Sequence, residues 1–596
     1  MSYEPGKHPL GHKTHEILAL GCSLRSGVAS AALAVSFLVA PAYAQDSSSR
    51  VERTSAPTQV AQIPAPILTP NTAPAHNAPA PTSGQSSSQG SGDSSRESSG
   101  PTSNFIDSLI PGFTLHVGVD ASESLTTNSG GSSANSNTDA ITLLGVRADI
   151  HDHSRRVSFD ANYNGGVDFY ANGTQNTQFA NYLDALANVI VIPDYVNFIG
   201  RAFAQPVVTS SVGFVTADGS VASNGYSNSY GYSVGPDITF RLGDFANSET
   251  NATYGAAYFT APSGSVAFPL IPGVLGPQDT TMRSFTERLS SGPDFTRLGW
   301  AVVAADNETD RPQGLLTERS GIGQLRYAIT RGFSILGTGG YDKITNTIPL
   351  RKNISGPVAT GGFAWTEGED FSLEIEVGQK YNSPSYQGLL RWNVTPTMLI
   401  TGSATDTIDT PEGQLLNNLS SLSATVDGTL AAASNIYANG HASPLASFSA
   451  MSTGATSFNQ GISRYQRVDL TASKDLDRNH FNINLYGSRQ TQLDVIFAGQ
   501  QVNNSYGGLA SYSRDISRVT TGTIGFGYQV YEELGGQSGL FSVNAQVTYS
   551  LGPNTQVYFR GDYLTRDASH SLQTLSPFTG NLDDIRLMVG ISHQLL

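Results

Sequence analysis

Charged residues that stand two positions apart recur along this chain, and they are its first candidates for chemistry. In an extended strand, residues two apart project to the same side, so each such group would lie on one face of its strand. If that face encloses water, the side chains line a lumen and influence which solutes enter it; cross-strand ion pairs are the alternative role. The candidate lumen-lining residues are Arg147, Asp149, Glu374, Glu376, Arg560, Asp562 and Arg586.

The sequence gives little indication of a catalytic site. A hydrolase needs a nucleophile with a base in reach and a third group that orients the base. His570-Ser571 and the segment from His441 to Ser443 bring a base close to a hydroxyl in sequence, but both fall in predicted loops. Asp583 and Asp584 are neighbours on a predicted strand and would face opposite sides, so they cannot share an acidic site.

Histidines next to acidic residues offer no specific metal site either. His116 and Asp120 share the polar face of a predicted strand, where a lumenal hydrogen bond is expected. His151-Asp152-His153 lies in a predicted turn, and such a group without further ligands is more often solvated than metal-bound. We therefore predict no catalytic site, no metal site, no cofactor and no enzyme activity.

The elements that must position these residues are amphipathic β-strands. Segments of about ten residues alternate apolar and polar side chains, as from Phe541 to Ser550, and the same period begins at Phe113 and at Phe371. From Phe113 onward the pattern predicts about 22 strands, within a range of about 18–22. No helical pattern covers the apolar face, so lipid must cover it. The predicted fold is all-β, an antiparallel transmembrane up-and-down β-barrel.

Predicted connections alternate between short turns rich in Pro, Gly, Asp and Asn and longer loops rich in Ser, Asn and Gly. This arrangement is typical of bacterial outer-membrane barrels, whose short turns lie in the periplasm. An even number of strands also places both ends of the barrel on the periplasmic side. The predicted long loops are 122–140, 205–224, 261–280, 305–318, 407–460 and 567–582.

Aromatic side chains near predicted strand ends fit the girdles that mark the edges of a membrane, although β propensity alone also favours them. They are Tyr163, Phe169, Tyr195, Phe198, Tyr327, Phe333, Tyr528 and Tyr531. A soluble β-propeller or β-helix would also have evenly spaced strands, but the sequence shows neither blade signatures nor stacked rungs. The net charge of −15 disfavours nucleic-acid binding, which needs a basic surface.

The segment before the predicted first strand is expected to lie outside the barrel, which should occupy residues 109–596. Residues 1–44 combine a basic start, an apolar stretch and the small-residue site Ala42-Tyr43-Ala44, and so predict a secretory signal peptide. Residues 45–108 are rich in Pro, Ala, Ser and Gly and predict a disordered periplasmic linker, either an inert tether or a docking segment. The only cysteine, Cys22, lies in the predicted signal peptide, in keeping with export to an oxidising compartment.

Two further segments concern assembly and the state of a pore. Residues 585–595 alternate strictly and form an amphipathic last strand of the kind that barrel-assembly machinery recognises, although the chain does not end in an aromatic residue. Within the 407–460 insert, Leu415, Leu419, Leu422 and Val426 follow a helical spacing. This insert could fold into the lumen and plug it, or remain a surface loop.

The segment from Ser229 to Phe245 resembles a recurrent segment of a family of bacterial outer-membrane β-barrel porins, and residues 465–473 with 482–486 resemble the later hairpins of that family. Some members are encoded with exopolysaccharide-production genes. The resemblance extends diffusely over 110–596 and carries no catalytic signature. It implies an outer-membrane location and passage or export of saccharides.

Two functions remain open from the sequence. The first is a porin-like channel for small hydrophilic solutes or a saccharide chain, in the outer membrane of a Gram-negative bacterium. The second is a structural or assembly component of an envelope or exopolysaccharide-secretion complex, without an open pore of its own. The expected partners are outer-membrane lipid, the barrel-assembly machinery through the last strand, and saccharides or polysaccharide-secretion components.

Overall fold

A computed structural model shows one antiparallel sheet of 22 strands, which confirms the predicted fold. The structure describes residues 113–129, 136–174, 177–208, 226–260, 279–312, 314–347, 352–409, 462–493, 502–533, 536–568 and 581–595. The strands are β1 (Phe113–Thr126), β2 (Asp139–His153), β3 (Val157–Tyr170), β4 (Gln178–Ile192), β5 (Val196–Val208), β6 (Tyr226–Leu242), β7 (Ala246–Phe259), β8 (Thr280–Ser291), β9 (Leu298–Arg311), β10 (Gly314–Ala328), β11 (Phe333–Asn346), β12 (Ile354–Glu367), β13 (Phe371–Lys380), β14 (Ser383–Thr395), β15 (Met398–Asp409), β16 (Ser463–Leu476), β17 (Asn479–Gln492), β18 (Val502–Ser517), β19 (Thr520–Glu533), β20 (Gly536–Ser550), β21 (Thr555–Ala568) and β22 (Leu582–Gln594).

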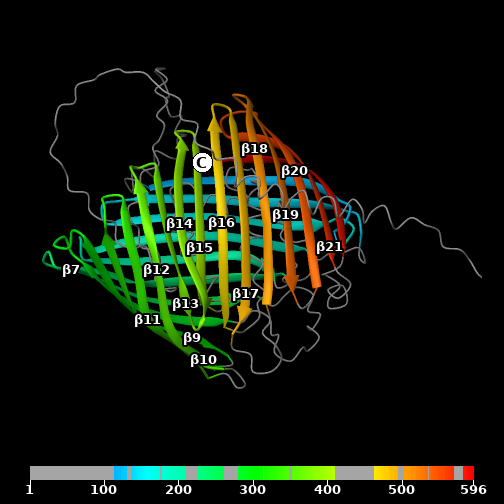
Figure 1. Cartoon of the computed structure of the whole chain (residues 1–596). Helices are drawn as coiled ribbons and strands as arrows, with labels where there is room; N and C mark the ends of the chain where they lie inside the picture. The colour runs from blue at the N-terminus through cyan, green and yellow to red at the C-terminus, as the bar shows by residue number, and fades with distance from the viewer. Residues whose placement is uncertain are drawn as a thin grey trace, which may run out of the picture. The chain divides into compact units, whose positions relative to one another are not determined.

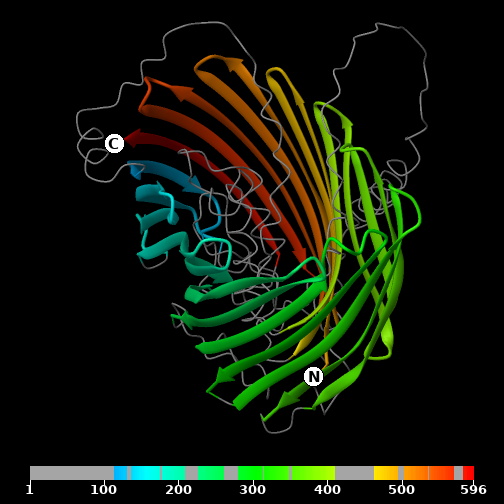
Figure 2. The ribbon, with the colours of Figure 1, turned by 90° about the vertical axis from the view of Figure 1, so that its left-hand side faces the viewer.

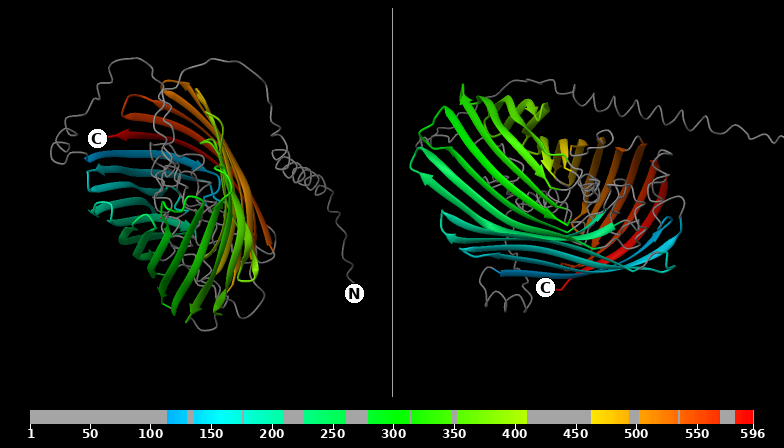
Figure 3. Two further views of the ribbon diagram at one scale, coloured as in Figure 1. Left: turned by 60° about the vertical axis from the view of Figure 1, so that its left-hand side comes forward. Right: turned by 90° about the horizontal axis from the view of Figure 1, so that it is seen from below.

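The sheet closes on itself because its first and last strands are paired. Each strand pairs antiparallel with the next one in the chain, and β1 also pairs with β22, from Gly118 opposite Gln594 to Thr126 opposite Arg586. Figure 1 shows successive strands side by side, and Figure 2 shows blue β1 next to red β22. The two views in Figure 3 show the strands surrounding a common interior. Closure removes the two outermost strand edges, as a lipid environment requires.

The two faces of the wall are opposite in character. On β22, Ile585 and Leu587 are 52% and 48% exposed, whereas Asp584 and Arg586 on the other face are 4% and 3% exposed. The same alternation of exposed apolar and buried polar residues runs through β1 and β20. An apolar outer face with a polar inner face reverses the arrangement of a water-soluble protein and fits a barrel in lipid.

The two ends of the barrel differ in their connections. At one end, the turn end, every connection from β2–β3 to β20–β21 has two to six residues. Non-glycine residues in the left-handed region, such as Asp194 with a φ of 66°, occur in these turns, as tight reversals demand. At the opposite end, the loop end, the longest connection is 410–462. β1 begins and β22 ends at the turn end, as the even strand count predicts.

One predicted long loop is wrong. β9 and β10 continue through residues 305–318, and only 312–313 connect them. The composition misleads because both faces are polar here: Asp306 and Arg319 form an ion pair of 3.3 Å on the outer face, while Asn307 faces inward. Strand ends that extend beyond the hydrocarbon zone need no apolar face. The connections 381–382 and 534–535 at the loop end are equally short, so the predicted alternation of short and long connections holds only in part.

The aromatic residues expected at a membrane edge are exposed on the outer face with one exception. Tyr531 is 5% exposed and faces inward, since it pairs with the inward-facing Ser505. At the turn end, Phe245 and Trp300 lie 5.9 Å apart between ring centroids, and other aromatic pairs follow around the wall. The exposed members of the predicted set are Tyr163, Phe169, Tyr195, Phe198, Tyr327, Phe333 and Tyr528.

Several predicted segments lie outside the described residues. They are the signal peptide (1–44), the linker (45–108) and the insert beyond residue 409, including the candidate helix from Leu415 to Val426. These assignments remain predictions. Among the residues that the structure describes, no helix has the length and apolar character needed to cross a membrane.

Candidate functional site

The candidate site is the inner face of the barrel wall, and all seven predicted residues lie on it. On β2, Arg147 and Asp149 alternate with Val146, which is exposed on the outer face. On β21, Arg560 and Asp562 likewise lie on the inner face, whereas their neighbour Phe559 is exposed on the outer face. Glu374 and Glu376 of β13 and Arg586 of β22 are likewise on the inner face. Whether these residues line a conducting path remains a prediction.

The predicted residues do not form one cluster. Arg560, Asp562 and Arg586 come together on β21 and β22, where Asp562 is directly opposite Arg586. The β2 pair lies nearby, on the far side of β1. Glu374 and Glu376 are on β13, well away from the β1–β22 contact in the strand order. The charges are therefore distributed around the wall, which favours a role in lining an interior over a role in a compact active site.

Each charged candidate has a polar partner in the wall. Arg560 donates from Nε to both oxygens of Asp562, at 2.8 and 3.0 Å. Arg147 and Asp149 are 3.9 Å apart, a much looser pair. Because the side chains of Arg560 and Asp562 are 1% and 19% exposed, this pair is largely withdrawn from solvent, whereas Asp149 is 25% exposed and more open to it.

The two β13 carboxylates are held by residues that the sequence did not single out. Glu374 pairs with Arg326 of β10 at 3.5 Å. Glu376 accepts hydrogen bonds from the hydroxyls of Thr338 and Thr360, at 3.0 and 2.5 Å. These partners belong to strands one to three positions away in the sheet. Like the predicted residues, they occupy positions that face inward by the two-residue alternation of their strands. That alternation is the only sequence signal that could have identified them.

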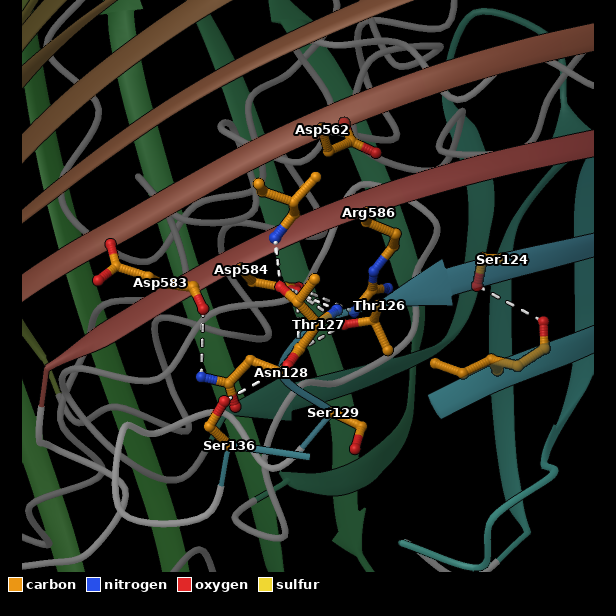
Figure 4. A network of polar contacts seen from close by, with 12 residues as sticks. Ser124, Thr126, Thr127, Asn128, Ser129, Ser136, Asp562, Asp583, Asp584 and Arg586 are labelled. Atoms are coloured by element: carbon orange, nitrogen blue, oxygen red, sulfur yellow. Dashed lines mark hydrogen bonds and ion pairs between the residues drawn. The ribbon is translucent and has the colours of Figure 1, made fainter. Parts of the chain in front are cut away.

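A polar network that the sequence pattern did not predict lies where the barrel closes (Figure 4). The Asp584 carboxylate of β22 accepts hydrogen bonds from the Thr126 hydroxyl at 2.7 Å and from the backbone amides of Thr127 and Asn128 at 3.1 and 3.0 Å. The Thr127 hydroxyl adds a fourth bond at 3.2 Å. Arg586 is 3.6 Å from the other carboxylate oxygen. Asp584 thus joins the loop end of β22 to that of β1.

Acidic side chains outnumber basic ones on the inner face of the described strands. The acidic residues are Asp120, Asp139, Asp149, Asp160, Asp168, Asp184, Asp237, Glu249, Glu318, Asp342, Glu374, Glu376, Asp409, Asp469, Asp475, Asp515, Asp562 and Asp584. The basic residues are Arg147, Arg201, Arg241, Arg288, Arg311, Arg326, Lys380, Arg391, Arg467, Arg560, Arg566 and Arg586. A wall of this composition is mixed in charge, with an acidic excess.

The residues considered for catalysis or metal binding do not assemble into such a site. His116 contacts Gln594 at 3.0 Å, and His151 contacts Asp160 at 2.8 Å. Asp583 and Asp584 face opposite sides of β22, as expected. In the described part of the chain, no group of three or more His, Cys, Asp or Glu residues has a geometry that could hold a metal ion. His441 and His570 lie outside the described residues.

Comparison with known proteins shows likeness of fold alone. No protein-family model matches the chain, and no curated protein matches it. The FrpB iron transporter from Neisseria meningitidis (F5-1 variant) is similar, with 10% sequence identity, a TM-score of 0.39 and coverage of 82% of this chain and 83% of that chain. The siderophore receptor PirA from Pseudomonas aeruginosa has 9% identity, a TM-score of 0.35 and coverage of 81% and 80%. OccK2 (OpdF) from Pseudomonas aeruginosa, solved in complex with glucuronate, has 7% identity, a TM-score of 0.30 and coverage of 81% and 98%.

Proposed function

We propose that this protein is a channel in the outer membrane of a Gram-negative bacterium, and that small hydrophilic solutes pass through its interior. The observation that carries the proposal is the closed wall with an apolar outer face and a charged, hydrogen-bonding inner face. Barrels of this strand number enclose either an aqueous interior or a plug. Charged side chains on the inner face of such a barrel contact water or one another rather than lipid.

The connections give the channel an orientation. In outer-membrane barrels, the short turns lie in the periplasm and the long loops face outward. The turn end, where β1 begins and β22 ends, would therefore be periplasmic. The loop end would be the outer mouth.

The inner face supports two expectations about the solutes. Its acidic excess favours cations over anions, because charged rings and walls select by electrostatics. Neutral hydrogen-bonding side chains also face inward on β17 and β18, where Asn482, Asn484, Ser488 and Ser511 are only half-buried. Such side chains can replace the hydration of sugar hydroxyls, so a saccharide is a reasonable cargo.

Single-channel recording in planar lipid bilayers tests the proposal. Purified protein should give discrete conductance steps, and in a KCl gradient the reversal potential should indicate a modest preference for K⁺. A panel of neutral and acidic saccharides added to one side should then reveal cargo through transient block of the current. Absence of conductance steps, in protein shown to be folded by its heat-dependent mobility in gels, would contradict the channel.

A folded barrel that shows no conductance would favour the second function, an anchoring component of an envelope or polysaccharide-secretion complex. That role predicts periplasmic partners for the linker. Affinity capture from solubilised membranes with the full chain and with a variant lacking residues 45–108 would then recover partners only with the full chain.

A further inference from the structure

Two basic side chains stand side by side on the outer face of the wall. Arg319 of β10 is directly opposite Lys343 of β11, and both are exposed. Like charges directly opposite each other on neighbouring strands repel, so such a pair is unfavourable unless an anion lies close to both. On its other side, Arg319 has Asp306 of β9 at 3.3 Å, whereas Lys343 has the uncharged Ser355 of β12. The row from Asp306 to Ser355 therefore carries an excess of positive charge.

Both cations lie at the level where the headgroups of the outer leaflet are expected. Arg319 is nine residues from the turn end of β10 at Ala328, and Lys343 is ten residues from the turn end of β11 at Phe333. A strand tilted by about 40° rises roughly 2.5 Å per residue along the barrel axis, so the two side chains are about 23 and 25 Å above the turn end. Since the apolar band of an outer-membrane barrel is about 25 Å tall, they fall at its outer edge.

Basic side chains are concentrated in this sector of the outer face. In the described strands, the exposed basic residues of the outer face toward the loop end are Arg283, Arg319, Lys343 and Arg489. Three of them belong to β8, β10 and β11, whereas Arg489 stands alone on β17 between the neutral Gln466 and Asn504. The acidic residues of the sector all belong to β9, on the far side of Arg319 from Lys343, and are Asp306, Glu308 and Asp310. An anion would therefore bind on the β10–β11 side.

Below these two cations, toward the turn end, the outer face has a patch without side chains. This patch, the glycine floor, consists of Gly321, Gly323, Gly337, Gly339 and Gly361. Gly323 is opposite Gly339, and Gly337 is opposite Gly361, so the floor crosses β10, β11 and β12. A Cβ added at Gly321, Gly337 or Gly339 would meet no atom within 4 Å. The floor is therefore open toward lipid.

Large apolar side chains stand around the glycine floor. Leu325, Tyr341 and Val377 are 57%, 55% and 58% exposed, and each is directly opposite a member of the floor. Because the floor has no side chains and its rim has long ones, the outer surface is hollowed between them. The hollow reaches the cations on β10, where Gly321 and Arg319 are consecutive residues of the outer face. An apolar hollow that ends at a basic pair matches a lipid with an acyl chain and an anionic headgroup.

We propose that this surface binds one phosphorylated glycolipid of the outer leaflet, with a phosphate between Arg319 and Lys343 and an acyl chain along the glycine floor. A phosphate accepts charge-assisted hydrogen bonds from guanidinium and ammonium groups, and its charge offsets their mutual repulsion. The inference rests on the proposed outward orientation of the loop end and not on conduction. That orientation decides the source of the phosphate, because phosphorylated glycolipid forms the outer leaflet of such a membrane and phospholipid the inner one.

Lipid titration of the full-length protein in detergent, followed by native mass spectrometry, tests the basic pair. The probes are lipid A, lipid A without its phosphates, and phosphatidylglycerol, and lipid A should bind at least tenfold more tightly than either of the others. R319A/K343A should reduce the affinity for lipid A at least tenfold. K343A alone, which leaves the ion pair of Arg319 with Asp306 intact, should reduce it at least threefold. R489A removes an exposed outer-face cation at the same end and should leave the affinity unchanged.

A second pair of variants tests the glycine floor. Gly339→Leu fills the hollow at a position where the added Cβ meets no atom, and it should lower the affinity for lipid A at least fivefold, with or without the phosphates. Ala545→Leu is the matched control, because Ala545 is exposed on the outer face of β20, and it should leave the affinity unchanged. Heat-dependent mobility in gels shows that each variant is folded.

Equal affinity of R319A/K343A and R489A for lipid A would overturn the site. So would phosphatidylglycerol that binds as tightly as lipid A, since that result would mean a general attraction of anionic lipids, and so would full affinity in Gly339→Leu. Conductance of the same protein separates the two proposals. Tight binding of lipid A by a folded barrel without conductance refutes only the channel, and conductance by a barrel that does not prefer lipid A refutes only the lipid site.

Discussion

Removal of the Asp584 carboxylate should weaken closure of the barrel. In Asp584→Ala, the hydroxyls of Thr126 and Thr127 and the amides of Thr127 and Asn128 lose an acceptor. Each amide keeps a second one: the Ile585 carbonyl at 3.1 Å for Thr127 and the Thr126 hydroxyl at 3.2 Å for Asn128. The loss is therefore closer to two charge-assisted hydrogen bonds than to four. At about 1.5–3 kcal/mol for each, the free energy of unfolding should fall by roughly 3–6 kcal/mol.

Two variants separate this effect from a general disturbance of β22. Asp584→Asn keeps one carbonyl oxygen as an acceptor and removes the charge, so a smaller loss of about 1–2 kcal/mol is expected. Asp583→Asn changes the exposed neighbour, which contributes only its backbone carbonyl to the network. Its effect should stay within about 0.5 kcal/mol.

Urea unfolding of the barrel in lipid vesicles, followed by tryptophan fluorescence, measures these differences. Hydrogen exchange adds a local readout, because the amides of residues 127 and 128 should exchange faster in Asp584→Ala while those of mid-wall strands should not. The reasoning is refuted if Asp584→Ala and Asp583→Asn unfold at the same urea concentration.

Three further outcomes are expected. Gly235→Ala should destabilise the barrel by about 1–3 kcal/mol, because the added Cβ would lie 1.8 Å from the Ala252 carbonyl oxygen, whereas Gly337→Ala, with no atom within 4 Å, should be neutral in the same unfolding assay. Phe559→Arg places a charge on the lipid face, where the native side chain is 57% exposed, and should cost about 2–4 kcal/mol in folding titrations with vesicles. Asp149→Asn should shift the reversal potential toward anions, whereas Glu367→Gln, on the outer face, should not.

The two-residue period of the sequence predicted the face of every candidate residue. A one-residue error in period would have turned Arg560 and Asp562 toward lipid, so the pattern carries strong information wherever one face must be apolar. It could not predict partners. Glu374 of β13 contacts Arg326 of β10 because the three strand pairings from β10 to β13 each have a fixed register. Register depends on turn geometry, which the spacing of charged residues does not encode.

The pattern itself fails at the loop end of β15. Alternation alone places Ile408 on the outer face, like the exposed Val468, but Ile408 is buried in a cluster with Leu316 and Ile344, which lie on the inner faces of β10 and β11. A signal was present in the sequence: Leu316 and Ile344 are aliphatic residues on the polar face of their strands, and each breaks the period. Apolar residues that interrupt a polar face indicate that something covers them, although only the structure shows what does.

The contact between β1 and β22 also constrains how the molecule can form. Thr126 and Asp584 are 458 positions apart, so their hydrogen bond cannot form until almost every strand between them has been laid down. Contacts of such separation carry a large loop-closure entropy and slow the approach to the native state. Until the ring closes, the growing sheet ends in two strands with exposed backbone donors and acceptors, which invite pairing with other chains. An assembly catalyst that occupied those edges would have to leave as β22 pairs with β1, and its release would be the last event in the making of the barrel.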